Sequence, residues 1–466
     1  MERRRQAVIL AAGDGKRMKS DQPKVLCQVL GRPMLTWVEE ACRQAGIQEI
    51  IVVAGDRPEL LRPAVSESCR FVQQRQRLGT GHAVLAAREL LDPAADVAVV
   101  CGDAPLLRPE DLKSAHARHQ QEQNAVTLLC ARLEDPTGYG RVVRRADGGV
   151  DAIVEERDAS ASQRQIQEVN SGAYWFSGAF LRDALPQLTA QNAQGEYYLT
   201  DTVALAVGAG LRAGAYLCPQ PDAALGANSR RQLQQLNGIA RRQVLDRHLE
   251  NGVDIPLEDG ILIGPQVRIG PDTQILPGTI LEGETSIGPG CVIGPNSMLK
   301  NTTVGAFCQI KASWLTDSTV GDHTTIGPFS QLRPGSHVGD HVKIGDFVEL
   351  KNTSLGDHTS VAHLTYLGDS QVGEWCNFGC GVVVANYDGN HKYRTVVGDR
   401  VFVGCNTNLV PPVTLGDGSY TAAGTTVDQD VPAGALAIGR VRQENKPGWA
   451  DEHVAFKKGP QPGNGR

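Results

Sequence analysis

The first stretch of the chain that could do chemistry is a glycine-rich turn. Residues 10–18 read LAAGDGKRM at the end of an apolar run, and Lys24 follows shortly after. A strand-to-helix turn of this kind presents backbone N–H groups to phosphate, and Arg17 and Lys24 add positive charge. It is not a Walker A loop, which needs Gly where Leu10 stands, and Met18 replaces the third Gly of a dinucleotide fingerprint. A phosphate site is one interpretation, and a purely structural turn is the other.

A carboxylate follows a second apolar run. Asp103 comes two residues after the run Val97–Cys101. Mg²⁺ takes one or two carboxylates together with substrate phosphates, so Asp103 is a candidate metal ligand. The same side chain could instead cap the helix that follows. Between the two loops, the amide of Gln74 can donate and accept at once, which would match the imide edge of uracil.

The second half of the chain carries a pair of cations and a histidine. Arg333 and Lys351 are eighteen residues apart, each directly after a leucine, and His363 lies twelve residues further on. In a coil with eighteen residues per turn the two cations stack on one edge as a phosphate clamp. His363 then lies on a neighbouring edge, and it could meet the clamp of another subunit across a trimer interface. Most histidines on such a surface are only solvated.

The N-terminal half must position the first two loops. Residues 6–220 alternate apolar, β-branched runs with helical patterns, which predicts a mostly parallel sheet covered by helices. Ligands bind such sheets at the carboxyl ends of the strands, where both loops lie. From Ser229 to Asn251 the pattern predicts a helical arm. The predicted strands are Ala7–Ala12, Ile50–Ala54, Val97–Cys101 and Ala125–Ala131.

The rest of the chain is organised by a repeat of six residues. From Ile263 to Val427 an aliphatic residue returns at almost every sixth position, often followed by Gly. This period fits a coil of short strands and Gly-rich corners around an aliphatic core, with roughly nine or ten turns of eighteen residues. The interval from Val384 to Val397 is thirteen residues instead of six. We therefore expect a loop to leave the coil beside His363.

Composition excludes several classes of partner. Charged residues make up 21% of the chain and the net charge is −6, so we expect no nucleic acid partner. No apolar segment approaches eighteen residues, which predicts neither a membrane span nor a signal peptide. The eleven cysteines include no C-x-x-C pair. We expect a soluble protein of a reducing cytoplasm whose cysteines are mostly small core residues.

The combination L-x-x-G-x-G-x-R-M followed by Pro-Lys is more specific than a glycine turn alone. It resembles the nucleoside-triphosphate sugar-phosphate nucleotidylyltransferases, with Lys16 where that family usually has Thr. The resemblance implies that Asp103 and Asn228 hold the metal and that Gln74 contacts uracil. The positions that it assigns to UTP and the UDP-sugar are Leu10, Ala11, Ala12, Gly13, Arg17, Lys24, Gln74, Gly79, Thr80, Gly140, Glu155, Asn170 and Asn228.

The repeats resemble the hexapeptide-repeat acyltransferases, whose fold is a left-handed parallel β-helix, although the general rule for parallel crossovers predicts a right-handed coil. Taken together, residues 6–450 resemble the bacterial bifunctional N-acetylglucosamine-1-phosphate uridylyltransferase/glucosamine-1-phosphate N-acetyltransferase family. This implies that His363 is the general base that deprotonates the attacking glucosamine amine. Cys405 departs from the family, where Ser is expected. The resemblance assigns the sugar phosphate to Arg333, Lys351, Tyr366 and Asn377, and acetyl-CoA to Cys380, Asn386, Tyr387, Cys405, Ala423 and Arg440.

The same resemblance implies an organisation. It implies a Rossmann-like α/β uridylyltransferase domain at residues 1–228, a helical linker at 229–250, a left-handed β-helix acetyltransferase domain at 251–446 and a flexible tail at 447–466. The implied enzyme acetylates glucosamine 1-phosphate with acetyl-CoA. It then transfers UMP from UTP to N-acetylglucosamine 1-phosphate, with Mg²⁺ at the N-terminal site, as a homotrimer. Two alternatives stay open: a single-activity nucleotidylyltransferase whose coil trimerises or regulates, and a non-enzymatic scaffold.

Overall fold

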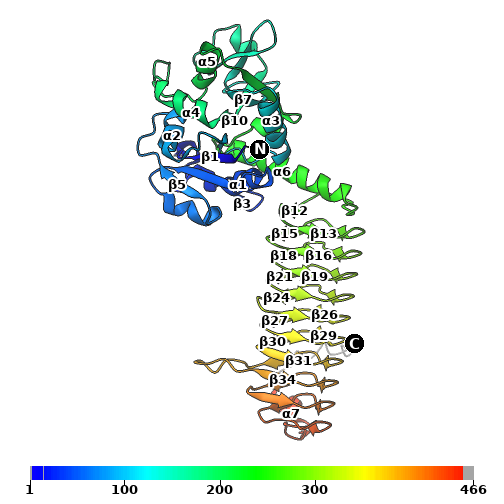
Figure 1. Cartoon of the computed structure of the whole chain (residues 1–466). Coiled ribbons are helices and arrows are strands. Elements are labelled where there is room, and N and C mark those ends of the chain that lie inside the picture. Colours follow the sequence, from blue (N-terminus) through cyan, green and yellow to red (C-terminus); the bar gives the residue numbers. More distant parts are fainter. Residues whose placement is uncertain (1–2, 14, 455–466) are drawn as a thin grey trace, which may run out of the picture. The chain divides into compact units, whose positions relative to one another are not determined.

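The computed structural model describes residues 3–13 and 15–454. These residues divide into two compact units. The first extends to Glu250 and includes Leu262–Pro265, and the second comprises Asn251–Ile261 and the chain from Gln266 onward. Figure 1 shows both units in the colours of the sequence.

The first unit is built on a sheet with the strand order β11-β7-β10-β6-β1-β4-β5, to which the hairpin β8-β9 is attached. The neighbours β6, β1, β4 and β5 run parallel to one another, and so do β7 and β11. The prediction of a mostly parallel sheet is confirmed for this strand order, in which β10 runs antiparallel to β6 and β7, and the attached hairpin is also antiparallel. The strands are β1 (Arg5–Ala11), β4 (Glu49–Ala54), β5 (Arg70–Gln73), β6 (Asp96–Cys101), β7 (Val126–Arg132), β8 (Arg141–Arg144), β9 (Val150–Val154), β10 (Glu168–Ser177) and β11 (Ala213–Leu217), with a separate small pair β2 (Gln28–Val29) and β3 (Arg32–Pro33).

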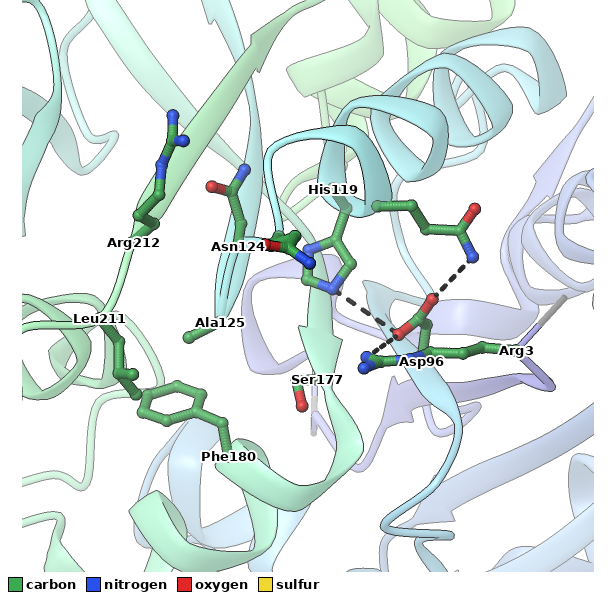
Figure 2. A pocket seen from close by; sticks show the side chains of 11 residues that line it. Arg3, Asp96, His119, Asn124, Ala125, Ser177, Phe180, Leu211 and Arg212 are labelled. Carbon is green, nitrogen blue, oxygen red and sulfur yellow. Dashed lines mark hydrogen bonds and ion pairs between the residues drawn. The ribbon is translucent and has the colours of Figure 1, made fainter. Parts of the chain in front are cut away.

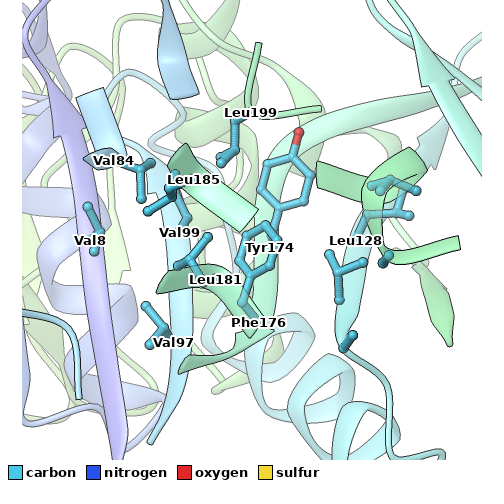
Figure 3. Packing of buried hydrophobic residues seen from close by; sticks show 14 of the residues in the cluster. Val8, Val84, Val97, Val99, Leu128, Tyr174, Phe176, Leu181, Leu185 and Leu199 are labelled. Atoms are coloured by element: carbon cyan, nitrogen blue, oxygen red, sulfur yellow. The ribbon is translucent and has the colours of Figure 1, made fainter. Parts of the chain in front are cut away.

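Both faces of this sheet are buried, which explains the continuous apolar runs. Alternate residues of a strand point to opposite faces. Val8 and Val97 therefore join one hydrophobic cluster and Ile9 and Val100 join the other, all of them fully buried. Figure 3 shows the first cluster closing around Phe176 of β10. The helices of this unit are α1 (Met34–Gln44), α2 (Thr80–Ala86), α3 (Pro109–Gln121), α4 (Gly178–Ala184), α5 (Asp201–Gly208) and α6 (Arg230–Glu250).

The second unit is a parallel β-helix. Its described residues form three parallel sheets, which the chain visits in rotation, so each strand pairs with the strand one turn later. With nine or ten strands in each sheet, the predicted number of turns is confirmed. We call the sheet that carries Arg333 and Lys351 sheet I and the sheet that carries His363 sheet III. Sheet II is the remaining sheet, and each of its strands comes directly after a strand of sheet I in the chain.

The strands of the β-helix are short. Sheet I contains β15 (Ile280–Glu282), β18 (Met298–Lys300), β21 (Trp314–Thr316), β24 (Gln331–Leu332), β27 (Glu349–Lys351), β30 (Tyr366–Gly368), β33 (Val383–Val384), β36 (Asn408–Leu409) and β39 (Thr426–Val427), and β12 (Leu262–Ile263) begins its order. Sheet II contains β13 (Arg268–Ile269), β16 (Ser286–Ile287), β19 (Thr303–Val304), β22 (Thr319–Val320), β25 (His337–Val338), β28 (Ser354–Leu355), β31 (Ser370–Val372), β34 (Thr395–Val397) and β37 (Val413–Leu415). Sheet III contains β14 (Gln274–Ile275), β17 (Val292–Ile293), β20 (Gln309–Ile310), β23 (Thr325–Ile326), β26 (Lys343–Asp346), β29 (Ser360–His363), β32 (Asn377–Phe378), β35 (Phe402–Val403), β38 (Tyr420–Thr421) and β40 (Leu436–Ala437).

The repeating aliphatic residues point inward, as predicted: Leu332 and Leu350 stack in register and are fully buried. Many corners have Gly, Asp or Asn with a positive φ angle, which suits these residues, but histidines also occupy corners. His323, His341 and His358 have positive φ angles, and their rings stack 4.8 and 4.9 Å apart on the surface. Stacking of aromatic rings along successive turns offsets part of the cost of this backbone conformation.

Two further predictions concern the loop and the tail. The thirteen-residue interval forms a loop between β33 and β34, closed by an antiparallel bridge between Tyr387 and Lys392, and Figure 1 shows it leaving the coil. Within the predicted tail, Trp449–His453 forms the short helix α7, and residues 455–466 lie outside the described part of the chain. Among the described residues, no helix combines the length and the apolar character needed to cross a membrane.

Candidate active sites

Two adjoining cavities open at the carboxyl ends of β1 and β6, where the sequence predicts ligand binding. The first, of about 350 Å³, contains Glu155 and is called the Glu155 cavity; the second, of about 300 Å³, contains Gln74 and is called the Gln74 cavity. Leu10, Thr80 and Asp103 line both of them. The two cavities together form one site in which the glycine-rich turn faces the predicted metal ligands.

The two predicted metal ligands converge on a single positive charge. The backbone N–H of Ala227 donates to the carbonyl of Asp103 (3.2 Å), which holds Asn228 beside that residue. The ammonium of Lys24 donates to the carboxylate of Asp103 and, at 2.8 Å, to Oδ1 of Asn228. Because the ammonium occupies a position between two oxygen ligands, the donor set fits a small hard cation. One carboxylate and one amide oxygen leave positions in the shell of such a cation for ligand phosphates and water.

The Glu155 cavity holds a carboxylate in an unusual environment. Burial, followed by the nearby charges of Asp201 and Asp158, raises the pKa of Glu155, although a hydrogen bond from Thr200 Oγ1 (3.3 Å) opposes the shift. A carboxylate of this kind has spare acceptor capacity for ligand hydroxyl groups. Gly140 lies against it, since a Cβ there would come within 3.4 Å of Glu155 Oε1.

An amide on β10 completes that cavity. Nδ2 of Asn170 donates to the hydroxyl of Tyr174 (2.6 Å), and Oδ1 accepts from the N–H of Gly172 (3.1 Å). Tyr174 is fully buried, which raises the pKa of its hydroxyl and keeps it neutral. The position of Asn170 is therefore fixed by β10 itself before any ligand arrives.

The Gln74 cavity is shaped by one glycine and one amide. Gly79 has a φ of 112°, and a Cβ there would lie 2.5 Å from the carbonyl oxygen of Tyr197, so no other residue fits without displacing backbone. Nε2 of Gln74 donates to the carbonyl of Gly79 (3.1 Å) and lies 3.1 Å from Nδ1 of His82. Both amide hydrogens are therefore engaged, and Oε1 is the atom left for a nucleobase. His82 accepts at Nδ1 and so helps to orient the amide of Gln74.

A thiol that the sequence places among core residues lines both cavities. Cys101 ends β6 at the boundary of the two cavities. Burial, and then the charge of Asp103, raises the pKa of the Cys101 thiol to about 12. The thiol is therefore neutral at physiological pH and is not a nucleophile.

The remaining predicted residues divide between the cavities. Arg17, Gly140, Glu155, Asn170 and Asn228 line the Glu155 cavity, whereas Ala12, Gly13, Lys24, Gln74 and Gly79 line the Gln74 cavity. Ala11 lines neither; it borders a smaller cavity of about 140 Å³ on the other side of the turn, shared with Ala12 and Gly13.

A larger cavity, of about 470 Å³, lies at the opposite end of the strands, where β6 begins (Figure 2). Its buried Asp96 accepts hydrogen bonds from Arg3 (3.2 Å) and Gln120 (3.2 Å) and lies 2.9 Å from Nε2 of His116. Burial lowers the pKa of the neighbouring His119 to about 4, so that ring is neutral. Protein groups therefore supply the hydrogen-bond partners of Asp96, and the network connects β6 to α3. We assign it a structural role and place the candidate active site at the other end of the sheet.

In the second unit, the cation pair stacks as predicted. Leu332 and Leu350 are partners in register, so Arg333 and Lys351 follow each other on sheet I one turn apart. Arg333 Nη1 also donates to Glu349 Oε1 (2.9 Å), which holds its guanidinium over the next turn. The sequence spacing of eighteen residues is confirmed as one turn at this point.

The loop adds a third cation that the sequence did not identify. Lys392 lies beside Lys351, and its proximity, followed by the charge of Arg333, lowers the pKa of Lys351. Glu349 and Asp369 neutralise part of this charge, and the remaining excess of positive charge favours a multiply charged ligand such as a phosphate. Lys392 reaches this point because the bridge between Tyr387 and Lys392 turns the loop back toward the coil.

Asn386 ties the base of the loop to the clamp. Its Nδ2 donates to Asp369 Oδ2 (2.5 Å), and Tyr366 OH lies 3.5 Å from its Oδ1. Burial alone would raise the pKa of Asp369, but hydrogen bonds from Asn352 and Asn386 hold it below its usual range. Asn386, Tyr366 and the clamp therefore form one polar cluster on sheet I.

His363 is the last residue of β29 and therefore lies on sheet III, not on the sheet that carries the cation pair. Its Nδ1 lies 2.8 Å from Oδ1 of Asp346, the residue one turn earlier in the same sheet. A carboxylate only accepts hydrogen bonds, so Nδ1 carries the proton and Nε2 presents a lone pair in the neutral ring. The hydrogen bond with His363 lowers the pKa of Asp346, which keeps that carboxylate ionised. This arrangement is that of an oriented general base.

The predicted acetyl-CoA positions follow His363 along sheet III. Because Val361, Phe378, Val403 and Thr421 are successive partners in register, the residues two positions after them, namely His363, Cys380, Cys405 and Ala423, form one column. Asn377, Cys380 and Cys405 thus belong to the His363 sheet, whereas Asn386 and exposed Tyr387 belong to the loop. The Cδ of Arg440 lies 3.8 Å from the Cβ position of Gly424, beside the end of the column.

Comparison with known proteins assigns each half to a family. Residues 7–194 match the MobA-like NTP transferase domain, and residues 260–301 and 317–352 match the bacterial transferase hexapeptide (six repeats). Together with the topology, these matches confirm the predicted fold class, an α/β nucleotidyltransferase domain followed by a left-handed β-helix of hexapeptide repeats.

Relatives that match along nearly the whole chain carry a common name. The chain is 47% identical over 453 residues to the bifunctional protein GlmU of Caldanaerobacter subterraneus subsp. tengcongensis, covering 97% of this chain and 98% of the relative. It is 46% identical over 452 residues to that of Thermoanaerobacter pseudethanolicus, with 97% and 98% covered. For Alkaliphilus metalliredigens the identity is 42% over 452 residues, with 97% and 99% covered.

Proposed function

The chain belongs to the family of bifunctional GlmU proteins, and from this premise we propose how its two candidate sites divide the work. It is an enzyme with uridylyltransferase and N-acetyltransferase activities. The β-helix acetylates glucosamine 1-phosphate with acetyl-CoA, and the first unit then transfers UMP from UTP to N-acetylglucosamine 1-phosphate. A single-activity enzyme with an inert coil is not favoured, since the bifunctional relatives extend over both halves.

The uridylyl transfer joins the two cavities of the first unit. A phosphate oxygen of the sugar 1-phosphate, held in the Glu155 cavity, attacks the α-phosphorus of UTP, held in the Gln74 cavity, and pyrophosphate leaves. The attacking oxygen is already ionised, so the reaction needs positioning and charge stabilisation but no protein base. Arg17, Lys24 and the N–H groups of the glycine-rich turn supply that charge.

The metal of this site would be Mg²⁺, held by Asp103 and Asn228. When bound, it neutralises phosphate charge and draws the phosphates of UTP into line. The observation that supports this assignment is the ammonium of Lys24 between the two ligand oxygens. With the metal held by these oxygens, the ammonium of Lys24 would be available to the triphosphate of UTP.

Sugar recognition rests on the Glu155 cavity. Glu155 accepts hydrogen bonds from sugar hydroxyl groups, while Gly140 gives the ligand room beside it. Asn170 is held by Tyr174 and Gly172 so that its amide faces the acetylamino group. The positions of these groups support an N-acetylated sugar phosphate as the ligand of this half of the site.

The acetyl transfer uses His363 as its base. Nε2 takes a proton from the glucosamine amine as that amine attacks the thioester of acetyl-CoA, and the developing imidazolium is stabilised by Asp346. Arg333, Lys351 and Lys392 hold the sugar phosphate, and Tyr366, Asn377 and Asn386 orient the sugar. Acetyl-CoA extends along the column of Cys380, Cys405 and Ala423 toward Arg440.

The clamp and His363 lie on different sheets of one coil, and a homotrimer would bring the sheet I cluster of one subunit to the sheet III column of its neighbour. Within each subunit, we assign residues 1–228 to the uridylyltransferase domain, residues 229–250 to the link between the two domains, and residues 251–446 to the acetyltransferase domain.

The observation that carries the acetyl-transfer assignment is the 2.8 Å contact between His363 Nδ1 and Asp346 Oδ1. It is tested with the full chain by supplying glucosamine 1-phosphate and acetyl-CoA and measuring release of the CoA thiol. Release that requires both substrates and is abolished by His363→Ala supports the assignment. Undiminished release from the His363→Ala variant contradicts it.

A further inference from the structure

The column that begins at the catalytic histidine contains two thiols in direct succession. From the register of sheet III, Cys380 lies one turn after His363, and Cys405 lies one turn after Cys380. The N–H of Asn406 donates to the carbonyl of Cys380 (2.8 Å), which ties the two turns together at this corner. Both thiols lie in the column assigned to acetyl-CoA, but neither takes or gives a proton or forms a bond in the acetyl transfer described above.

These two cysteines differ from most of the others in being accessible. Cys405 is exposed and Cys380 is partly exposed, whereas the other cysteines are buried except for Cys101, which is partly exposed in the first unit. The buried pair Cys291 and Cys308 lies inside the coil and is out of reach of a solute. Cys380 and Cys405 are therefore the thiols of the β-helix that an oxidant in solution can reach.

The geometry of the column suits a disulfide. Stacked turns are about 4.8 Å apart, which lies within the range of about 4.4–6.8 Å between the Cα atoms of bridged cysteines. A Cβ placed on Gly379 would lie 2.9 Å from Sγ of Cys405, so this sulfur leans over the preceding turn, next to Cys380. Gly379 and Gly381 flank Cys380 and allow the small tilt of its backbone that brings the two sulfurs together.

We propose that Cys380 and Cys405 form a reversible disulfide that shuts off acetyl transfer under oxidative stress. The oxidant is a peroxide. One thiol loses its proton, and its thiolate attacks an oxygen of the O–O bond to give a sulfenic acid and a hydroxide, which takes up that proton to become water. The second thiol then attacks the sulfenic sulfur, and its proton leaves with the sulfenic oxygen as a second water. The sum is two thiols and one hydrogen peroxide giving one disulfide and two waters. A dithiol reductant reverses the reaction by exchange.

The bridge acts because of its position. It replaces two separate side chains by a rigid cross-link in the column along which acetyl-CoA extends, one turn from His363, so the thioester can no longer approach the base. The effect on activity rests on the proposed function of this column, whereas the formation of the bridge does not. The first unit lies outside this reaction, because its partly exposed thiol, Cys101, has no second cysteine among the described residues that line its two cavities.

The first measurement looks for the bond alone. The full chain is treated with hydrogen peroxide, remaining thiols are alkylated, and the peptides are analysed by mass spectrometry without reduction. We expect a cross-linked peptide that joins Cys380 to Cys405 and disappears after treatment with dithiothreitol. If the two cysteines are instead recovered separately alkylated or separately oxidised, the proposal is overturned, whatever the protein catalyses.

The second measurement follows activity in the same samples. CoA release and pyrophosphate release are measured for the wild type, Cys380→Ser and Cys405→Ser, each with and without peroxide. The treated activity of each protein is compared with its own untreated activity. We expect peroxide to reduce CoA release by the wild type at least ~10-fold, with recovery by dithiothreitol, and to leave most of the activity of both Ser variants and all pyrophosphate release. A cross-link without loss of CoA release, or an equal loss in the Ser variants, contradicts the switch. No CoA release from untreated protein would instead refute the proposed function.

Discussion

Asp346 and His363 occupy equivalent positions in successive turns of the β-helix, and Oδ1 of the carboxylate lies 2.8 Å from Nδ1 of the imidazole. This contact fixes which ring nitrogen carries the proton and directs the basic nitrogen away from Asp346. The two side chains are 59% and 40% exposed, so the pair is available to a substrate and contributes little to stability.

The first prediction concerns this pair. Asp346→Asn should lower kcat for acetyl transfer by about 10–100-fold with little change in KM for acetyl-CoA, because an amide no longer selects the productive tautomer or stabilises the imidazolium. Steady-state kinetics of CoA release measure both constants. Glu374→Gln, an exposed acidic residue on the same domain, is the matched control and should behave as wild type. A rise in KM alone would show that Asp346 binds substrate and does not position the base.

The second prediction concerns the third cation. Lys392→Gln should raise KM for glucosamine 1-phosphate by about 10-fold, because a charge-assisted hydrogen bond to phosphate is lost. The effect should shrink as salt is added, since exposed charges are screened. Kinetics at two ionic strengths measure it, with Lys311→Gln on an earlier turn as the control. An unchanged KM would remove Lys392 from the phosphate site.

The third prediction concerns Glu155. The pKa of this buried carboxyl is raised, so it becomes protonated at a higher pH than an ordinary glutamate and then accepts fewer hydrogen bonds. KM for N-acetylglucosamine 1-phosphate in pyrophosphate release should therefore rise as the pH falls through that raised pKa. Glu155→Gln should raise KM by about 10–100-fold and abolish this pH dependence. Glu134→Gln, an exposed residue of the same domain, should leave both unchanged.

The fourth prediction concerns stability in acid. Burial lowers the pKa of His119 to about 4, against 6.5 for a solvated histidine. Between these two values the unfolded chain binds a proton that the native state excludes, so stability falls as the pH decreases from 6.5 to about 4 and falls no further below. The loss from this residue is about 3 kcal/mol. Hydrogen exchange of peptides from α3 measures it, and His119→Gln should flatten the slope. An equal slope in the variant would assign the acid sensitivity to other groups.

Regular features of the structure could be predicted from the sequence. The six-residue repeat fixed the turn length, and this placed Arg333 over Lys351 and His363 on another sheet. The β-branched runs predicted a buried, mostly parallel sheet because such residues suit strands covered on both faces. In both cases a regular local pattern, the six-residue step of the coil or the alternation of side chains along a strand, determines which residues share a face.

Features that depend on departures from the repeat could not be predicted. If every turn had eighteen residues, His363 would pair with Gly345. In the structure it pairs with Asp346, because this turn has seventeen residues. Lys392 joins the clamp only through the bridge that folds the loop back, and the pairing of Tyr387 with Lys392 has no signature in spacing. The contact of Lys24 with Asp103 and Asn228 joins segments far apart in the chain. These contacts are set by tertiary packing.

The central claim is that the protein has two independent active sites, and a paired assay tests it most directly. Full-length wild type, His363→Ala and Asp103→Ala are each assayed for CoA release with acetyl-CoA and glucosamine 1-phosphate, and for pyrophosphate release with UTP, Mg²⁺ and N-acetylglucosamine 1-phosphate. His363→Ala should lose about 10²–10⁴-fold in CoA release and keep pyrophosphate release, and Asp103→Ala should show the reverse pattern. Loss of both activities in either variant, or of neither, would contradict the account.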